Sequence, residues 1–101
     1  MDINAVHFED RSVISVDGIK FLGIEVETFN NAIKNSIDKG SRNISIDLSK
    51  VNYISSSGVE LLMHAYVACT KKNIGFNVEG ASKHVKDVLN TLKLANLFKI
   101  S

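Results

Sequence analysis

Three consecutive serines at positions 55–57 are the residues whose type and spacing point most clearly to chemistry. They follow a strand-like run, 43–48, in which apolar and polar residues alternate, and they precede Gly58 and a long apolar pattern of helical period. The three hydroxyls are therefore expected at the N-terminal end of a helix, where the helix dipole and free backbone amides favour negative charge. A phosphate added there would be stabilised locally and still be accessible to a partner.

The same serines also have a purely structural explanation. Ser57 and Glu60 have the spacing of a capping box, in which both side chains bond to free backbone amides of the first helical turn. Capping accounts for one serine and leaves Ser55 and Ser56 at the tip of the loop, where side chains are usually exposed. The two interpretations are compatible if Ser57 caps the helix and Ser56 accepts a phosphate.

Serine hydrolase chemistry is not favoured by the pattern around Ser56. The Gly-x-Ser-x-Gly elbow is missing, because Ile54 stands two residues before Ser56. The three histidines, His7, His64 and His84, fall on one predicted strand and two separate predicted helices. We therefore predict no catalytic residue, and a protein that is not an enzyme.

Metal and cofactor sites have no support in the sequence either. No His, Cys or carboxylate pair shows the close spacing of a zinc or calcium site, and neither a P-loop nor a glycine-rich dinucleotide turn is present. We expect no metal and no cofactor. The one cysteine, Cys69, excludes an internal disulfide, fits a reducing compartment and is interpreted as a small core residue.

The composition is that of an ordinary globular domain. The 101 residues are 45% hydrophobic and 23% charged, which predicts a single domain over residues 1–101. A formal net charge of +1 gives no general electrostatic reason to bind nucleic acid or an anionic membrane, and we expect no nucleic-acid partner and no direct membrane insertion. No signal peptide or membrane-spanning run is evident, so we expect a cytoplasmic protein.

Lys83, His84 and Lys86 crowd the expected first turn of the last helix, where cations oppose the helix dipole. A solvated face is the favoured interpretation. The alternative is a basic edge that meets an acidic partner.

The periodicity predicts strands and helices in alternation. The expected order is two hairpin strands, a helix ending near Gly40, a strand, a helix, a strand, a helix capped by Ser82, and an apolar tail that docks on the domain. This order predicts an α/β fold with a mixed sheet of four to five strands and helices mainly on one face. The expected segments are 6–9, 12–17, 22–37, 43–48, 58–72, 74–78, 82–92 and 94–100.

One motif in this pattern resembles the signature of the STAS family, above all its single-domain anti-sigma-factor antagonists. The similarity extends over the whole chain, through Gly18 and the closing Leu94-x-x-Leu97-Phe98-Lys99-Ile100. It implies a mixed STAS-like sheet and a regulatory serine at the start of the helix after the third strand. The motif is Asp47-Leu48-Ser49-x-Val51-x-x-Ile54-x-Ser56-Ser57-Gly58-Val59.

In the family pattern an acidic residue precedes two hydroxyl residues and a glycine, and the first hydroxyl residue accepts the phosphate. The resemblance thus assigns phosphorylation to Ser56, with Ser57 as the alternative, and the acidic position to Ser55. This chain departs from the pattern at Ser55 and at Glu60, where a small residue is frequent. It also reads Ile-Lys-Phe at 19–21, where antagonists often carry acidic residues. The predicted partner-binding residues are Ser55, Ser56, Ser57, Gly58, Asn52 and Lys20.

The resemblance implies a phosphorylation-switched regulator in a bacterial partner-switching pathway. The unphosphorylated form would bind its partner, and phosphorylation of Ser56 would release it. The implied partners are a serine protein kinase of the anti-sigma type, a metal-dependent serine phosphatase and a downstream effector protein. The implied outputs are sigma-factor and transcription control, exopolysaccharide and biofilm control, or secretion. The alternative is a scaffold subunit of a transport or signalling assembly that is never phosphorylated.

Overall fold

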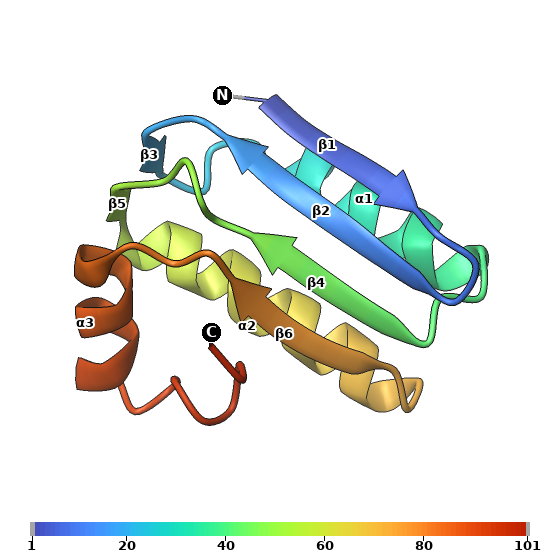
Figure 1. The fold of residues 1–101 in the computed structure, drawn as a ribbon. Coiled ribbons are helices and arrows are strands. Elements are labelled where there is room, and N and C mark those ends of the chain that lie inside the picture. The colour runs from blue at the N-terminus through green and yellow to red at the C-terminus, as the bar shows by residue number, and fades with distance from the viewer. Residues whose placement is uncertain (1, 101) are drawn as a thin grey trace.

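The computed structural model describes residues 2–100 and contains two sheets and three helices (Figure 1). In the main sheet the strand order is β1-β2-β4-β6; β1 runs antiparallel to β2, and β2, β4 and β6 run parallel. The second sheet is the short parallel pair β3 and β5. The bounds are β1 Asp2–His7, β2 Arg11–Asp17, β3 Lys20–Phe21, α1 Val26–Asp38, β4 Asn43–Asp47, β5 Tyr53–Ile54, α2 Ser56–Lys71, β6 Gly75–Glu79 and α3 Lys83–Thr91.

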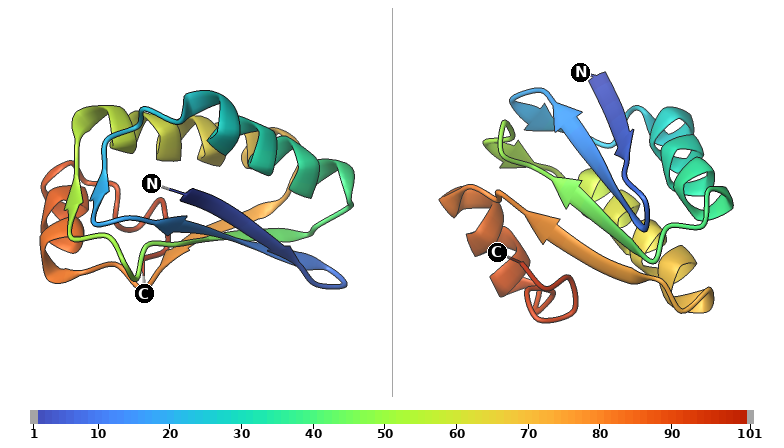
Figure 2. Two further views of the ribbon diagram at one scale, coloured as in Figure 1. Left: turned by 90° about the horizontal axis from the view of Figure 1, so that it is seen from above. Right: turned by 45° about the vertical axis from the view of Figure 1, so that its right-hand side comes forward.

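The helices α1 and α2 lie side by side over one face of the main sheet, whereas α3 stands at the end of the sheet beside β5 (Figures 1 and 2). The opposite face of the main sheet carries no helix in these views. The predicted α/β fold, a mixed sheet with helices mainly on one face, is therefore confirmed.

Alternation along the strands explains this layering. The residues of β2 alternate between buried and half-buried, and Ile14 and Val16 point to the helices. The apolar side chains of β6 do the same at Phe76 and Val78. Because successive side chains of a strand face opposite sides, one face is apolar and packs on α1 and α2 while the other stays polar.

Two segment boundaries differ from the sequence-based expectation in ways that matter for the serines. The helix α1 begins at Val26 and not at Leu22, because Gly23 adopts a positive φ of +74° and breaks the helical path. Earlier in the chain, Lys20 and Phe21 form β3. A strand of two residues is too short to show a period, so the sequence pattern did not predict it. The helix α2 begins at Ser56, before the expected Gly58.

The C-terminal segment docks as predicted. Phe98 is fully buried, and its carbonyl accepts a hydrogen bond from the N–H of Val78 in β6 at 3.0 Å. Its ring packs edge-on against Phe76 at 5.7 Å between centroids, and Tyr66 of α2 lies 6.0 Å from both rings. The expected helix 82–92 ends one residue earlier, at Thr91, and Leu92 beyond it is 51% exposed. Within residues 2–100 no helix is long and apolar enough to cross a membrane.

Candidate functional site

The short parallel pair β3–β5 positions the serines. Phe21 lies opposite Ile54, and the carbonyl of Phe21 accepts a hydrogen bond from the N–H of Ser55 at 3.0 Å. The N–H of Asn52 donates to the carbonyl of Ile19 at 2.7 Å. The loop that precedes α2 is therefore held on both sides of β5, and the chain enters the helix in one fixed direction.

Ser55 is the N-cap of α2. Its backbone is extended (φ −89°, ψ 171°), and its hydroxyl accepts a hydrogen bond from the N–H of Gly58 at 3.2 Å. The same hydroxyl donates to the carbonyl of Phe21 at 3.4 Å. The expectation that Ser57 caps the helix is therefore wrong: the helix begins at Ser56, and Ser57 already lies inside its first turn. Glu60 is exposed one turn further along.

Ser56 and Ser57 are both exposed in the first turn of α2. Among residues 2–100, neither hydroxyl has a hydrogen-bond partner, and the first turn contains no acidic residue. The first backbone N–H groups of a helix have no partner within the helix. The two free hydroxyls therefore lie beside amides and a dipole end that favour an anion.

Two glycines allow β3 and the loop after it to pack closely against the first turn of α2. Gly58 is buried, and a Cβ there would lie 2.5 Å from the carbonyl oxygen of Phe21. A Cβ on Gly23 would lie 2.6 Å from the carbonyl carbon of Ser57. Only residues without a side chain permit this approach. The contact between segment 19–24 and the serines is a feature that the sequence analysis missed.

Ser56 opens onto a groove of about 440 Å³ between the start of α2 and the side of α3. Tyr53 and His84 lie in this groove with their rings stacked, 5.6 Å between centroids and 15° between planes. Leu92, exposed by 51%, forms part of its wall. The full lining is Tyr53, Ile54, Ser55, Ser56, Val59, His84, Asp87, Val88, Thr91 and Leu92.

Exposed apolar side chains also surround the serines on the side of the β3 loop. Ile19 and Ile24 are 65% and 74% exposed, and Leu22 is 37% exposed. The backbone contacts described above hold this loop against β5 and α2. We call the exposed residues of segment 19–24, segment 52–57 and the α3 wall of the groove the serine surface. This concentration of exposed apolar groups makes the serine surface a candidate interaction site.

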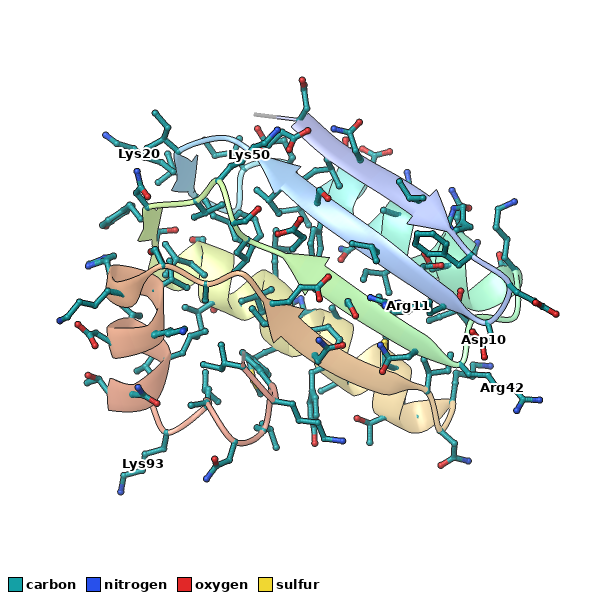
Figure 3. All side chains as sticks on the ribbon, in the orientation of Figure 1. Asp10, Arg11, Lys20, Arg42, Lys50 and Lys93 are labelled. Carbon is teal, nitrogen blue, oxygen red and sulfur yellow. The ribbon has the colours of Figure 1, made fainter. Side chains whose placement is uncertain are left out.

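Five of the six predicted partner-binding residues belong to segments 19–24 and 52–57, and the sixth, Gly58, is buried beneath them. Lys20 is exposed in β3 (Figure 3) and pairs in register with Tyr53, and Asn52 is exposed in the loop before β5. Gly58 is buried and contributes by its packing. Of the cations noted at the start of α3, Lys83 pairs with Asp87 at 3.2 Å. His84 lies in the groove beside Tyr53, a position that its place in the sequence did not reveal.

Neither serine–histidine arrangement in the structure has the geometry of a hydrolase. Ser56, His84 and Asp87 line one groove, but within residues 2–100 no hydrogen bond links them, and Asp87 pairs with Lys83. A nucleophile, a base and an orienting acid must be within hydrogen-bond reach of one another. His7 Nδ1 does lie 2.8 Å from the hydroxyl of Ser12, yet Ser12 is fully buried.

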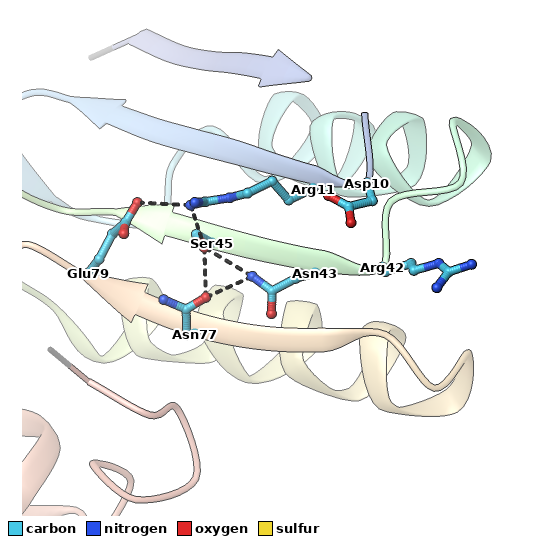
Figure 4. A pocket seen from close by; sticks show the side chains of 7 residues that line it. All are labelled: Asp10, Arg11, Arg42, Asn43, Ser45, Asn77 and Glu79. Atoms are coloured by element: carbon cyan, nitrogen blue, oxygen red, sulfur yellow. Dashed lines mark hydrogen bonds and ion pairs between the residues drawn. The ribbon is translucent and has the colours of Figure 1, made fainter. Parts of the chain in front are cut away.

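A second hollow lies on the open face of the main sheet, at the other end from Lys20 (Figures 3 and 4). Ser45 donates to the side-chain oxygen of Asn77 at 2.7 Å and receives bonds from Arg11 at 3.3 Å and Asn43 at 3.1 Å. Arg11 also lies 3.8 Å from Glu79. These polar side chains are therefore hydrogen-bonded to one another, and they link β2, β4 and β6 across the hollow.

The described part of the chain has no group of side chains arranged for metal binding and no accessible thiol. Among residues 2–100, no three His, Cys, Asp or Glu side chains lie close enough to hold a metal ion. Cys69 is buried in α2, and burial raises the pKa of its thiol to about 11. At neutral pH this thiol is protonated and inaccessible, which is a structural role.

A family model for the STAS domain matches residues 2–101, and the chain belongs to the STAS family. The predicted family membership is therefore confirmed. No curated protein matches the chain in sequence.

Solved structures share the fold over nearly the whole chain. An anti-sigma-factor antagonist (STAS) domain protein from Planctomyces limnophilus is 25% identical, with a TM-score of 0.81 over 97% of this chain and 87% of that one. An anti-sigma factor antagonist from Mycobacterium paratuberculosis is 23% identical, with a TM-score of 0.79 over 98% and 83%.

The anti-sigma factor antagonist SpoIIAA, in its unphosphorylated form, is 17% identical, with a TM-score of 0.82 over 99% of this chain and 88% of that one. The Bacillus SpoIIAA in its phosphorylated form matches with a TM-score of 0.76 over 99% and 91%, again at 17% identity. At this identity the likeness to SpoIIAA shows a common fold.

Proposed function

We propose that this STAS domain is a protein-binding regulator of the partner-switching type, controlled by phosphorylation of Ser56. It acts by binding and not by catalysis. The observation that carries the proposal is that Ser55 is used as the helix cap while the hydroxyls of Ser56 and Ser57 stay exposed at the start of α2.

The fold can accept a phosphate on Ser56 with little change. A phosphoserine adds about −1.5 to −2 charge units at neutral pH. The helix N-terminus and its free amides stabilise an anion by roughly 0.3–1 kcal/mol at an exposed position. Glu60, one turn along the same face, adds a repulsion of only a few tenths of a kcal/mol. The hydroxyl of Ser56 is exposed, so a phosphate on it displaces no core contact.

The same phosphate would disrupt a bound partner. Apolar side chains on both sides of Ser56, such as Ile24 and Leu92, favour a partner surface that covers the serine and removes it from water. Burying a charge without a matching partner group costs several kcal/mol. Since about 1.4 kcal/mol is tenfold in affinity, one phosphate is sufficient to release the partner.

The partners that fit this cycle are a serine protein kinase of the anti-sigma type and a metal-dependent serine phosphatase. The unphosphorylated form binds the kinase or a downstream effector, and the phosphorylated form is released. The support is membership of the STAS family and a fold shared with anti-sigma factor antagonists, among them SpoIIAA in both phosphorylation states. The output of the pathway is sigma-factor and transcription control, exopolysaccharide and biofilm control, or secretion.

The test is to reconstitute the chain with its cognate kinase and ATP and to map the phosphate by mass spectrometry. We expect phosphate on Ser56 in the wild type and in Ser57→Ala, and none at the serine surface in Ser56→Ala. Ser56→Ala should keep the affinity for the partner, whereas Ser56→Asp should weaken it at least tenfold. Phosphate confined to a distant hydroxyl such as Ser82 contradicts the proposal, and phosphate on Ser57 alone keeps the switch but moves the residue.

The scaffold alternative predicts a different result in the same material. A constitutive subunit of a transport or signalling assembly would copurify with that assembly and take up no phosphate from the kinase. Ser56→Asp would then leave the assembly intact.

A further inference from the structure

The two edges of the main sheet are treated differently by the chain. At the β6 edge the C-terminal segment lies alongside, and its Phe98 carbonyl bonds to the N–H of Val78. At the other edge β1 pairs with β2 alone, and in the view from above no segment lies in front of it (Figure 2). An edge strand presents a row of free N–H and C=O groups that can pair with another strand.

The free edge also lacks the usual features that prevent pairing. The strand reads Asp-Ile-Asn-Ala-Val-His over Asp2–His7, with neither proline nor lysine, and its register with β2 is continuous without a bulge. Val6 is 54% exposed, and Phe8 just beyond the strand is 57% exposed. The chain thus covers one edge and leaves open a regular edge that carries the exposed side chains of Val6 and Phe8, a surface suited to a further strand.

The hairpin geometry identifies which backbone groups face outward. The N–H of Phe8 bonds to the carbonyl of Arg11 at 2.8 Å, and in an antiparallel pair hydrogen-bonded and non-hydrogen-bonded pairs alternate. The backbone groups of Ile3, Ala5 and His7 therefore point away from β2. Ala5 is the central residue of this outward row.

We propose that β1 pairs antiparallel with β1 of a second copy of this chain, with the twofold axis at Ala5. The two main sheets then form one continuous sheet through the dimer, and each outward backbone group of one β1 bonds to the other. A twofold contact of this kind uses the same patch on both subunits.

The outward backbone row of Ile3, Ala5 and His7 is centred on Ala5, so a second copy running in reverse meets it with each outward group opposite its equivalent. With the axis at Ala5, Ile3 lies opposite His7 of the partner subunit on the helix side of the sheet. On the open side, Val6 lies opposite Asn4 of the partner subunit, and Phe8 opposite Asp2 of the partner subunit. No like charges meet directly, and the exposed apolar surface of Val6 and Phe8 becomes partly covered.

The dimer is independent of the proposed phosphorylation switch. The serine surface lies at the β3–β5 end, beyond the start of β1, whereas the proposed axis at Ala5 lies midway along that strand (Figure 1). Pairing of two six-residue strands is a small interface, and we expect a weak association that depends on concentration.

The test is sedimentation velocity of the full chain across a concentration series, with two sets of variants. Ala5→Pro removes the outward N–H at the axis and should weaken dimerisation at least tenfold, whereas Ala5→Val keeps the N–H and should remain dimeric. Circular dichroism and thermal melting establish that Ala5→Pro is folded, since proline is tolerated where the N–H of an edge strand faces outward.

The second set does not depend on proline. Ala5→Lys and Ala5→Glu each place like charges across the axis and should each be weaker dimers, while an equimolar mixture should form the mixed dimer. A wild type that stays monomeric throughout the series overturns the proposal. So does a dimer that none of the Ala5 variants affects, because it must then use another surface.

Discussion

The hydroxyl of Ser55 accepts a hydrogen bond from the backbone N–H of Gly58 at 3.2 Å, which makes Ser55 the cap of α2. This contact explains one departure from the family pattern, in which an acidic residue stands at the position of Ser55. Serine and aspartate are both among the preferred N-cap residues. Serine at position 55 therefore keeps the local geometry of the loop before Ser56 and places one negative charge fewer beside Ser56 than the family pattern has.

Replacing the cap should cost stability, whereas restoring the family residue should not. We expect Ser55→Ala to lower the free energy of unfolding by about 1 kcal/mol, and Ser55→Asp to leave it nearly unchanged, because aspartate also accepts the N–H of Gly58. Urea denaturation followed by circular dichroism measures both. Ser57→Ala, an exposed position in the same turn, is the control and should have no comparable cost. Equal losses for all three variants would contradict the assignment of the cap.

Phosphorylation of Ser56 should leave the fold intact. We expect backbone amide chemical shifts to change within segments 19–24 and 52–58 and along the facing side of α3, because these surround the hydroxyl. The residues of β1 and the docked segment around Phe98 should not change. Two-dimensional NMR spectra of the phosphorylated and unphosphorylated protein provide the comparison. Perturbations spread through the main sheet would show that release operates by rearrangement and not by local charge.

The groove beside Ser56 should contribute to partner affinity through Leu92. This side chain is 51% exposed, and a partner that covers it gains up to about 1–2 kcal/mol of apolar burial. Leu92→Ser should therefore weaken partner binding by about tenfold with little change in stability, as measured by isothermal titration calorimetry. Val67 is 41% exposed on α2 outside this groove, so Val67→Ser is the matched control. If the two variants bind equally, the partner does not use the groove.

A side chain at Gly58 should disturb the contact between the β3 loop and α2. Its Cβ would meet the Phe21 carbonyl oxygen at 2.5 Å and Cγ1 of Ile54 at 2.9 Å. Overpacking of this kind costs about 1–3 kcal/mol, which exceeds the roughly 0.5–1 kcal/mol that alanine gains over glycine in a helix. We expect Gly58→Ala to be destabilised by about 1 kcal/mol or more in thermal melting. A variant more stable than the wild type would mean that this contact is looser than described.

The buried thiol of Cys69 predicts a loss of stability at alkaline pH. Its pKa rises from 9.0 to about 11 in the folded protein because burial disfavours the thiolate. Below pH 9 both states hold the proton. Between about pH 9 and 11 only the folded state holds it, so the free energy of unfolding falls with pH, by up to about 3 kcal/mol in total.

Denaturation measured at several pH values tests this, with Cys69→Ala as the reference. The wild type should lose more stability than the variant between pH 9 and 11, since other alkaline groups titrate in both. The thiol should also resist alkylation at neutral pH until the protein unfolds. If the stability of the two proteins falls equally with pH, the raised pKa of Cys69 is contradicted.

Much of this fold could be predicted from local patterns. The alternation along 43–48 and the helical period after Gly58 appear in the structure as β4 and α2, and Ser82 caps α3 as expected. These elements are set by side-chain periodicity and hydroxyl caps, which depend on neighbours within a few residues. The motif around Ser56 also identified the family, because its spacing reflects the strand, loop and helix start.

The tertiary structure alone decided which serine is the cap and what surrounds the other two. Whether Ser55 or Ser57 caps the N-terminus of α2 depends on the carbonyl of Phe21. This group is 34 residues away in the sequence and holds Ser55 in place through two hydrogen bonds. The position of His84 beside Tyr53 depends likewise on how α3 packs against β5. Periodicity determines which face of an element is apolar, but contacts between distant segments determine which hydroxyls remain free, because they fix where the backbone groups can find partners.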